Sequence, residues 1–337
     1  MVNIVTREEY GFLKAHKRLG KNMILLTLGG SHAYGTNVEG SDIDVRGCAL
    51  NSKEEILLGQ DFEQVIDNTT DTVVYSFHKL IGLLAGCNPN IIEMLGCKPE
   101  HYILLSDTGK ELLNNKKLFL SQKAVNSFGG YANQQLRRLL NALARDSYTQ
   151  KEKERHIALS CESAMHSFSE RYQEIPEGSI KLSVSASEKE ELEQEIFVDA
   201  NLSHYPLRDF HGMISDFSNI LRNYNKINHR NNKKDELHLN KHAMHLIRLY
   251  LMCFDILEKE EINTYREKER EFLLSIRNGK FMKEDGSYRS EFFEMVNEYE
   301  KRLEYAKENT ALPKEPDMKK IGEFVMEINE KVVKEAL

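Results

Sequence analysis

A short apolar run from Met23 to Leu28 ends at Gly29-Gly30-Ser31, and the triplet Asp42-Ile43-Asp44 begins eleven residues after the serine. The run is too short for a typical helix and is bounded by turn residues, so it predicts a buried strand. The alternation of polar and apolar residues from Asp42 to Arg46 predicts a second strand. This segment therefore constrains the chain to a sheet that carries a glycine turn and paired carboxylates.

Each part of the segment suits the binding of a nucleoside triphosphate. Glycines let the backbone approach a phosphate closely, and the amides and the Ser31 hydroxyl can donate hydrogen bonds to phosphate oxygens. We therefore expect Gly30 and Ser31 to bind the nucleotide. Asp42 and Asp44, one strand residue apart, point to the same face and can jointly hold Mg²⁺ or Mn²⁺. Two such ions about 4 Å apart activate an attacking hydroxyl and neutralise a leaving pyrophosphate.

A third carboxylate normally completes such a site, and Asp67 and Asp71 are the candidates. Asp71 is favoured because Val73, Tyr75 and Phe77 have the spacing of a strand that returns beside the first pair. Taken separately, a Gly-Gly-Ser sequence is often only a turn and an Asp-x-Asp sequence is often a solvated strand face. Their combination at this spacing predicts the site, with Asp42, Asp44 and Asp71 as catalytic metal ligands.

Three stretches of the chain resemble nucleotidyltransferases of the DNA polymerase β superfamily, in particular its YcgL-like and RNA repair-associated families. The first, residues 30–47, contains the Gly-Ser and Asp-x-Asp sequences, and the second, residues 71–95, contains Asp71, Lys79 and an Asn-Pro-x-x-x-Glu segment. The third, residues 241–279, contains Arg266 and Arg270. The resemblance implies that the three aspartates bind metal and that Ser31 binds the nucleotide phosphates.

We expect an α+β fold with a polymerase β-like nucleotidyltransferase domain over residues 1–120, built on a small mixed sheet flanked by helices. A C-terminal helical domain over residues 121–337 completes the cleft for nucleotide and acceptor. The apolar spacing in this second part predicts helices over residues 124–145, 156–172, 239–258, 266–276, 290–307 and 318–333. Residues 173–187, with Pro176 and Gly178, are expected to form an irregular connection.

Lys241, His245 and Arg248 are spaced to share one face of a helix, from which they can reach a triphosphate together. For an isolated helix a solvated basic stripe is the simpler interpretation, but the resemblance favours nucleotide binding. Lys79 is a further candidate for charge near the phosphates. Arg46 can serve the same purpose or can simply pair with Asp44.

The resemblance implies metal-dependent transfer of a nucleoside monophosphate from an NTP or dNTP to an acceptor hydroxyl, with release of pyrophosphate and with two Mg²⁺ or Mn²⁺ ions. An RNA or tRNA 3′ end is the leading acceptor. Two other acceptors stay open: a protein hydroxyl, as in AMPylation, and a growing untemplated oligonucleotide, both in a toxin-antitoxin or phage-defence setting. A different class is an inactive nucleotide-sensing or partner-binding module, against which the presence of all three acids argues.

The formal net charge of −7 argues against a protein that coats nucleic acid through a global positive field. No stretch approaches the roughly 18 apolar residues that span a bilayer, and the N-terminus lacks the layout of a signal peptide. The five cysteines are widely spread, which predicts free thiols. We therefore expect a cytoplasmic protein that does not bind membranes.

Overall fold

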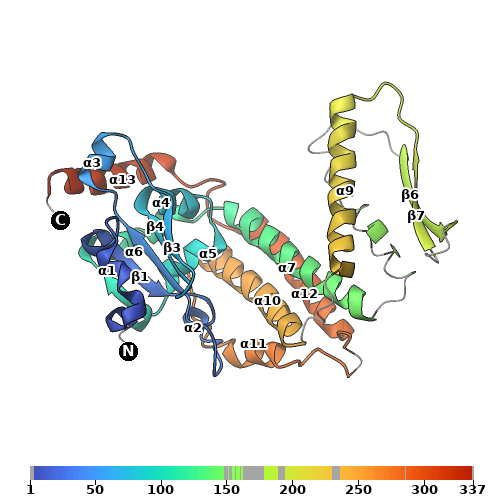
Figure 1. Cartoon of the computed structure of the whole chain (residues 1–337), viewed down its shortest axis with the longest axis horizontal. Helices are drawn as coiled ribbons and strands as arrows, with labels where there is room; N and C mark the ends of the chain where they lie inside the picture. Colours follow the sequence, from blue (N-terminus) through green and yellow to red (C-terminus); the bar gives the residue numbers. More distant parts are fainter. Residues whose placement is uncertain are drawn as a thin grey trace. The chain divides into compact units, whose positions relative to one another are not determined.

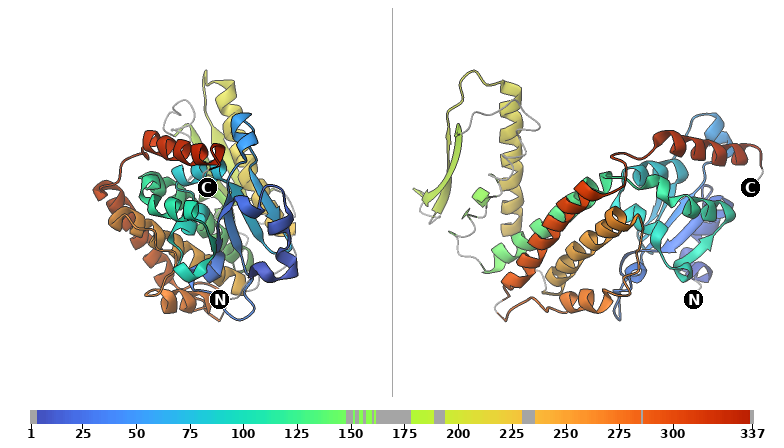
Figure 2. Two further views of the ribbon diagram at one scale, coloured as in Figure 1. Left: turned by 90° about the vertical axis from the view of Figure 1, so that its left-hand side faces the viewer. Right: turned by 180° about the vertical axis from the view of Figure 1, so that it is seen from behind.

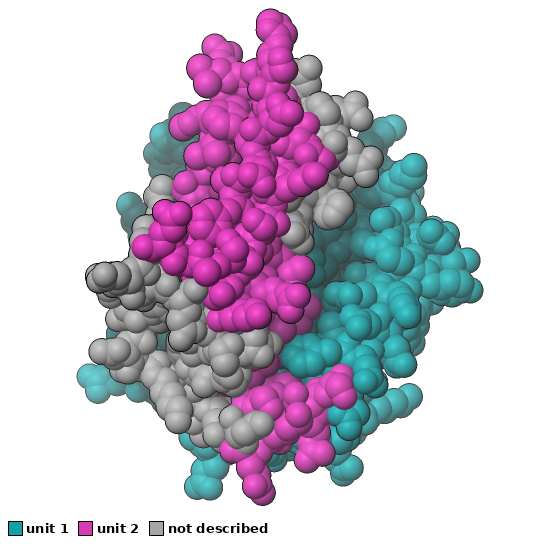
Figure 3. Space-filling model, turned by 90° about the vertical axis from the view of Figure 1, so that its right-hand side faces the viewer, with its two compact units in different colours: residues 1–135, 243–280, 291–337 teal, residues 136–242, 281–290 magenta. Residues whose placement is uncertain are grey.

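The computed structural model describes residues 4–147, 178–188, 194–229, 236–284 and 286–335, together with residues 151, 154, 155, 157–159 and 161. The chain forms two compact units, coloured separately in Figure 3: unit 1 is residues 1–135, 243–280 and 291–337, and unit 2 is residues 136–242 and 281–290. The long helices α7 (Lys123–Ser147) and α10 (Glu236–Lys259) contribute to both units. The expected boundary at residue 120 falls inside unit 1, which also contains the C-terminal helices.

Unit 1 is built on a five-stranded mixed sheet with the strand order β3-β4-β2-β1-β5 (Figure 1). β1 pairs antiparallel with β2 and with β5, β2 pairs parallel with β4, and β3 is antiparallel to β4. The strands are β1 (Met23–Leu28), β2 (Val45–Ala49), β3 (Gln64–Asp67), β4 (Thr72–Ser76) and β5 (Tyr102–Leu105). The prediction of an α+β fold with a small mixed sheet is confirmed.

Short helices connect the strands, and the local sequence explains where several of them begin. The Ser52 hydroxyl accepts a hydrogen bond from the Glu55 N–H while the Glu55 carboxylate accepts one from the Ser52 N–H, which forms a capping box. Ser76 caps the next long helix, and Asn88 caps a helix whose first residue is proline, as its sequence predicts. These helices are α1 (Phe12–Ala15), α2 (Gly30–Tyr34), α3 (Lys53–Leu57), α4 (Phe77–Ala85), α5 (Pro89–Ile92), η4 (Glu93–Gly96) and α6 (Asp107–Asn114).

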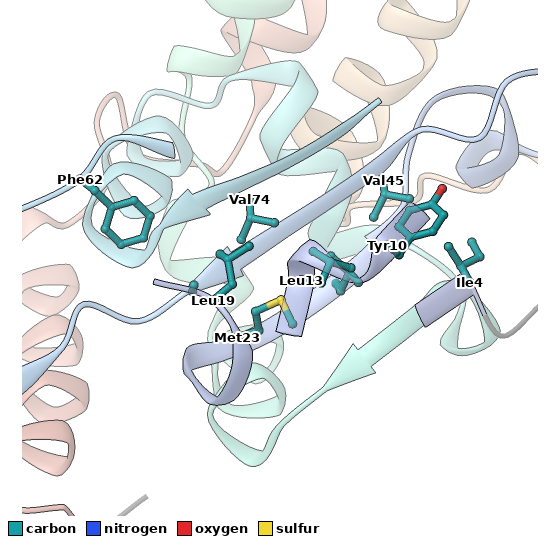
Figure 4. Close-up of a cluster of buried hydrophobic side chains, with 10 residues drawn as sticks. Ile4, Tyr10, Leu13, Leu19, Met23, Val45, Phe62 and Val74 are labelled. Carbon is teal, nitrogen blue, oxygen red and sulfur yellow. The ribbon is translucent and has the colours of Figure 1, made fainter. Parts of the chain in front are cut away.

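One face of the sheet packs against the N-terminal turns and α1, as Figure 4 shows. The N-terminal segment contributes Tyr10 and Leu13 to this core, and β2 and β4 contribute Val45 and Val74. Successive side chains of a strand point to opposite faces, so Arg46, which follows Val45, points to the other face. The Arg46 side chain therefore lies on the side of the sheet away from α1.

Helices make up the C-terminal part of unit 1: α11 (Arg270–Arg277), α12 (Ser290–Asn309) and α13 (Met318–Val333). α12 lies alongside α7 and α10 (Figures 1 and 2), where the Tyr299 ring contacts the rings of Tyr250 and Phe254 edge-on. α13 packs on α3, and its Phe324 ring lies 6.3 Å from that of Phe77. Helices are thus confirmed in these three predicted segments, although α11 begins four residues later than expected. No helix in the described part of the chain has the length and apolarity needed to cross a membrane.

Unit 2 contains a pair of antiparallel strands, β6 (Ile180–Ala186) and β7 (Gln194–Ala200), and the long helix α9 (Leu207–His229). The expectation of an irregular connection over residues 173–187 is therefore wrong for β6. Its residues Ile180, Leu182 and Val184 alternate with polar residues, which is the period of a strand. The predicted helix over residues 156–172 lies largely outside the described residues.

Two helix glycines should respond in opposite ways to alanine. A Cβ on Gly109 in α6 would lie 2.2 Å from the Ile24 carbonyl oxygen of β1, whereas a Cβ on Gly82 in α4 would meet no atom within 4 Å. We expect Gly109→Ala to lower the free energy of unfolding by about 2–3 kcal/mol, because two backbones must separate. We expect Gly82→Ala to raise it by about 0.5–1 kcal/mol, because alanine favours the helix. Urea unfolding of both variants measures the difference, and equal effects would contradict the close approach of α6 to β1.

Candidate functional site

One edge of the sheet gathers the glycine turn and the acidic residues. The end of β1 faces the start of β2, with Leu28 opposite Val45, and the starts of β2 and β4 lie side by side. The Gly29 N–H donates to the Asp44 carbonyl at 2.8 Å, and the Val45 N–H donates to the Asp71 carbonyl at 3.1 Å. Gly29, Asp44 and Asp71, each one residue outside a strand, are therefore brought together.

The aspartate pair was predicted to lie on a strand, but β2 begins only at Val45. The reason is that β1 ends at Leu28, after which the chain turns into α2. The pairing of β1 with the segment before β2 therefore stops at the hydrogen bond between Gly29 and Asp44. Both aspartates thus lie in the segment that leads into β2. Asp44 is half-buried there, whereas Asp42 is exposed.

The Asp44 carboxylate lies directly against the glycine turn. Gly30 has a φ of +51°, and a Cβ on it would lie 1.9 Å from Asp44 Oδ2. Only glycine leaves room for the carboxylate in this place, and its backbone conformation is one that other residues rarely adopt. The Ser31 hydroxyl, one residue further, has no hydrogen-bond partner among the described residues. The turn therefore combines a close carboxylate with a hydroxyl that can bind a ligand.

Arg46 lies between two of the predicted metal ligands. Its Nη1 donates to the carbonyls of Asp71 at 2.7 Å and Val45 at 2.9 Å. Its Nη2 lies 3.3 Å from Asp44 Oδ1 and 3.4 Å from Asp71 Oδ1. The shorter bonds to the backbone anchor the guanidinium, while the longer contacts hold the carboxylates more weakly. Of the two roles open to Arg46, the pairing with Asp44 is observed.

The two candidates for a third carboxylate differ in their surroundings. Asp67 Oδ1 accepts hydrogen bonds from the N–H and the hydroxyl of Thr70, both at 2.9 Å, which closes the turn between β3 and β4. Asp71 has a left-handed backbone with φ of 45°, and its side chain is exposed beside Arg46. The geometry thus brings Asp71 to Asp44, while Asp67 serves the turn.

A buried polar cluster of Tyr34, Glu93 and Arg248 lies behind the site. The Tyr34 hydroxyl donates to Glu93 Oε2 at 2.6 Å, and the Arg248 guanidinium lies 3.6 Å from the centre of the Tyr34 ring. Burial raises the pKa of Glu93, although the nearby Arg248 opposes this shift. Burial and the Glu93 charge raise the pKa of Tyr34 well above its ordinary value, so the phenol remains a donor. The sequence analysis did not assign Tyr34 to the site, because its partners Glu93 and Arg248 lie far away in the sequence.

The other predicted nucleotide-binding residues are not gathered in one place. Lys79 follows the far end of β4 from Asp71, and its Nζ pairs with Glu63 at 2.5 Å. Lys241 is exposed in unit 2, while His245 is half-buried in unit 1. Arg248 contacts the cluster that contains Tyr34 and Glu93. Its Nε and Nη1 are buried without an acceptor in the described part of the chain.

Comparison with known proteins agrees with the resemblance expected from the sequence. Residues 6–157 match the family described as RlaP, RNA repair pathway DNA polymerase beta family. Neither the curated proteins nor the solved structures contain a match to this chain. The matched residues include the five-stranded sheet, the glycine turn and the aspartates at the sheet edge. Over residues 6–157, the chain is therefore similar to the RNA repair pathway DNA polymerase beta family.

Proposed function

We propose that this protein transfers a nucleoside monophosphate from an NTP or dNTP to an acceptor hydroxyl and releases pyrophosphate. The observation that carries the proposal is the gathering of Gly30, Asp44 and Asp71 at one sheet edge, with the Asp44 carboxylate against the glycine turn. The family of residues 6–157 supports the same chemistry and an RNA repair pathway. The acceptor we propose is therefore an RNA 3′ end, including that of tRNA.

The donor set suits the divalent ions that such a reaction uses. Asp42, Asp44 and Asp71 offer only carboxylate oxygens, which are preferred by Mg²⁺ and Mn²⁺. The Arg46 guanidinium between Asp44 and Asp71 supports this fit, because the edge already accommodates positive charge there. Among the described residues, no three His, Cys, Asp or Glu side chains form a preassembled metal cluster. We propose that two ions are held by these three aspartates and supply charge neutralisation at the phosphates when bound.

Each residue of the edge has a role in this proposal. The amides of the glycine turn and the Ser31 hydroxyl donate hydrogen bonds to phosphate oxygens. Asp71, the most exposed of the contacts of Arg46, is on the side from which an acceptor can approach and accepts the proton of the attacking hydroxyl. Arg248 contributes positive charge from behind the turn, where two of its nitrogens lack an acceptor in the described chain.

The test incubates the protein with each α-³²P-labelled NTP or dNTP, Mg²⁺ or Mn²⁺, and RNA that ends in a 3′ hydroxyl. The matched control is the same RNA with a 3′-deoxy end, which lacks the attacking group. Label on the first RNA only, with an equal amount of pyrophosphate, is the expected result. Label on the protein would indicate that the acceptor is a protein hydroxyl and not RNA. Label in oligonucleotides formed without added RNA would indicate untemplated synthesis. If the protein binds nucleotide but releases no pyrophosphate in any mixture, the remaining interpretation is an inactive nucleotide-sensing module.

A further inference from the structure

The C-terminal end of α2 is held by a distant segment, residues 264–277, which we call the strap. The strap consists of the last six residues before α11, residues 264–269, together with α11 itself. Three consecutive carbonyls at the end of α2 each accept one hydrogen bond from it. The Arg266 N–H donates to Tyr34 at 3.2 Å, Arg270 Nε donates to Gly35 at 2.7 Å, and Arg277 Nη1 donates to Thr36 at 2.6 Å.

The strap is itself anchored to the body of unit 1. The Thr264 N–H donates to the Gly96 carbonyl at 3.1 Å, and its hydroxyl donates to the Glu93 carbonyl at 2.6 Å. Arg266, only 3% exposed, forms an ion pair with Asp255 of α10 at 2.7 Å. The strap is therefore a fixed support on which α2 can be positioned.

Steric contact adds to the hydrogen bonds at Gly35. This residue has a φ of +72°, and a Cβ on it would lie 2.5 Å from Cε2 of the Tyr265 ring. Only glycine at this position leaves room for the Tyr265 ring, so the strap is in close steric contact with the residue that follows α2.

α2 depends on such outside support because it has only five residues. A single helical turn is unfavourable on its own, since several dihedral angles are fixed for very few hydrogen bonds. The last carbonyls of any helix also lack partners within it. The Tyr34 carbonyl, the last of α2, accepts from the Arg266 N–H. Arg270 and Arg277 hold the carbonyls of the two residues that follow the helix, and hydrogen bonds from a charged group are stronger than those between neutral groups. The strap therefore fixes the C-terminal end of α2, and the single turn of helix connects this end to Gly30 and Ser31.

We infer that Arg270 and Arg277 are positioning residues for nucleotide binding, which act through α2 on the phosphate-binding turn. The inference rests on the proposed function, because it assumes that Gly30 and Ser31 bind the nucleotide phosphates. Neither arginine needs to touch the nucleotide. Each holds one carbonyl at the opposite end of the helix that begins with the turn.

The test measures affinity for the α,β-methylene analogues of the four NTPs, with Mg²⁺, and the steady-state constants of the transfer reaction. We expect Arg270→Ala and Arg277→Ala each to weaken analogue binding and to raise KM by about 10-fold or more, with a smaller effect on kcat. Arg270→Lys retains a donor for the Gly35 carbonyl and should recover most of the affinity.

Arg302→Ala is the matched control. Arg302 of α12 donates two hydrogen bonds to Glu258 of α10, at 2.8 and 2.6 Å, and no contact between it and α2 is found among the described residues. This variant should lower the melting temperature without changing analogue affinity. Wild-type affinity in both alanine variants of the strap, or an equal loss in Arg302→Ala, would overturn the inference. A wild-type protein that binds none of the four analogues or their deoxy counterparts, and that transfers no nucleotide, would instead refute the proposed function, and the inference with it.

Discussion

We expect that replacing Asp44 with Asn lowers the rate of the proposed nucleotidyl transfer by about 10²–10³-fold or more, the scale typical of the loss of one element of transition-state charge stabilisation. In the wild-type protein Arg46 Nη2 lies 3.3 Å from Asp44 Oδ1. The asparagine amide retains an oxygen that can accept a hydrogen bond from Arg46, so the sheet edge should keep its shape. What disappears is the negative charge that we propose binds a divalent ion. Transfer rates at saturating nucleotide, together with Mn²⁺ affinity from electron paramagnetic resonance, measure both effects.

The same exchange at the other aspartates identifies the third metal ligand. Asp71→Asn should lose activity on a similar scale. Asp67→Asn should keep nearly all of it, because an asparagine oxygen can still accept the two hydrogen bonds that Thr70 donates at 2.9 Å. If Asp67→Asn loses activity and Asp71→Asn keeps it, the third ligand is Asp67. If Asp44→Asn retains full Mn²⁺ affinity, the proposed metal site is wrong.

The elements that can be predicted from this sequence are those whose signal is local. Met23–Leu28 is a strand because a short apolar run is followed by two glycines, and the observed bounds agree to the residue. Helices α10, α12 and α13 follow from apolar spacing alone. β6 was missed because Pro176 and Gly178 precede it, although its own alternation is regular.

Some positions in the candidate site can also be predicted from the local sequence, whereas others cannot. The gathering of Gly29, Asp44 and Asp71 is predictable because each comes directly before or after a strand of the same sheet. The location of Lys79 cannot be predicted in this way, because it depends on the direction of β4 in the sheet. That strand runs from Asp71 toward Ser76, so its parallel pairing with β2 takes Lys79 to the opposite end. A local pattern cannot reveal which strands will pair.

The contacts behind the turn depend on residues far apart in the sequence. The Tyr34 hydroxyl meets Glu93 and its ring meets Arg248, while Arg270 and Arg277 reach the carbonyls that follow α2. The resemblance marks residues 266–279 as part of a family pattern, but spacing alone assigns these arginines no partner. Their role follows only from the packing of the C-terminal helices against the N-terminal sheet within unit 1.

Gly30→Ala should reduce the rate of nucleotidyl transfer strongly but the free energy of unfolding only slightly. A Cβ at residue 30 would lie 1.9 Å from Asp44 Oδ2 and 2.8 Å from Asp44 Cγ, so the carboxylate must move. Displacement of a catalytic group by about 1 Å can cost about 10²-fold in rate. We therefore expect transfer to fall by at least about that factor. The loss in free energy of unfolding should be only about 1–2 kcal/mol, because Asp44 is a short side chain that can turn away and the remaining cost is the left-handed backbone.

Gly59→Ala supplies the matched control for Gly30→Ala. Gly59 has a φ of +63°, close to the +51° of Gly30, but a Cβ on it would meet no atom within 4 Å. Both variants pay for the same backbone conformation, so their urea unfolding curves should shift by similar amounts. Only Gly30→Ala should lose transfer activity and Mn²⁺ affinity, because only there does the new methyl group displace a predicted metal ligand. Equal activity in the two variants would show that Asp44 need not lie against the glycine turn for catalysis, and the arrangement on which the proposed function rests would then be wrong.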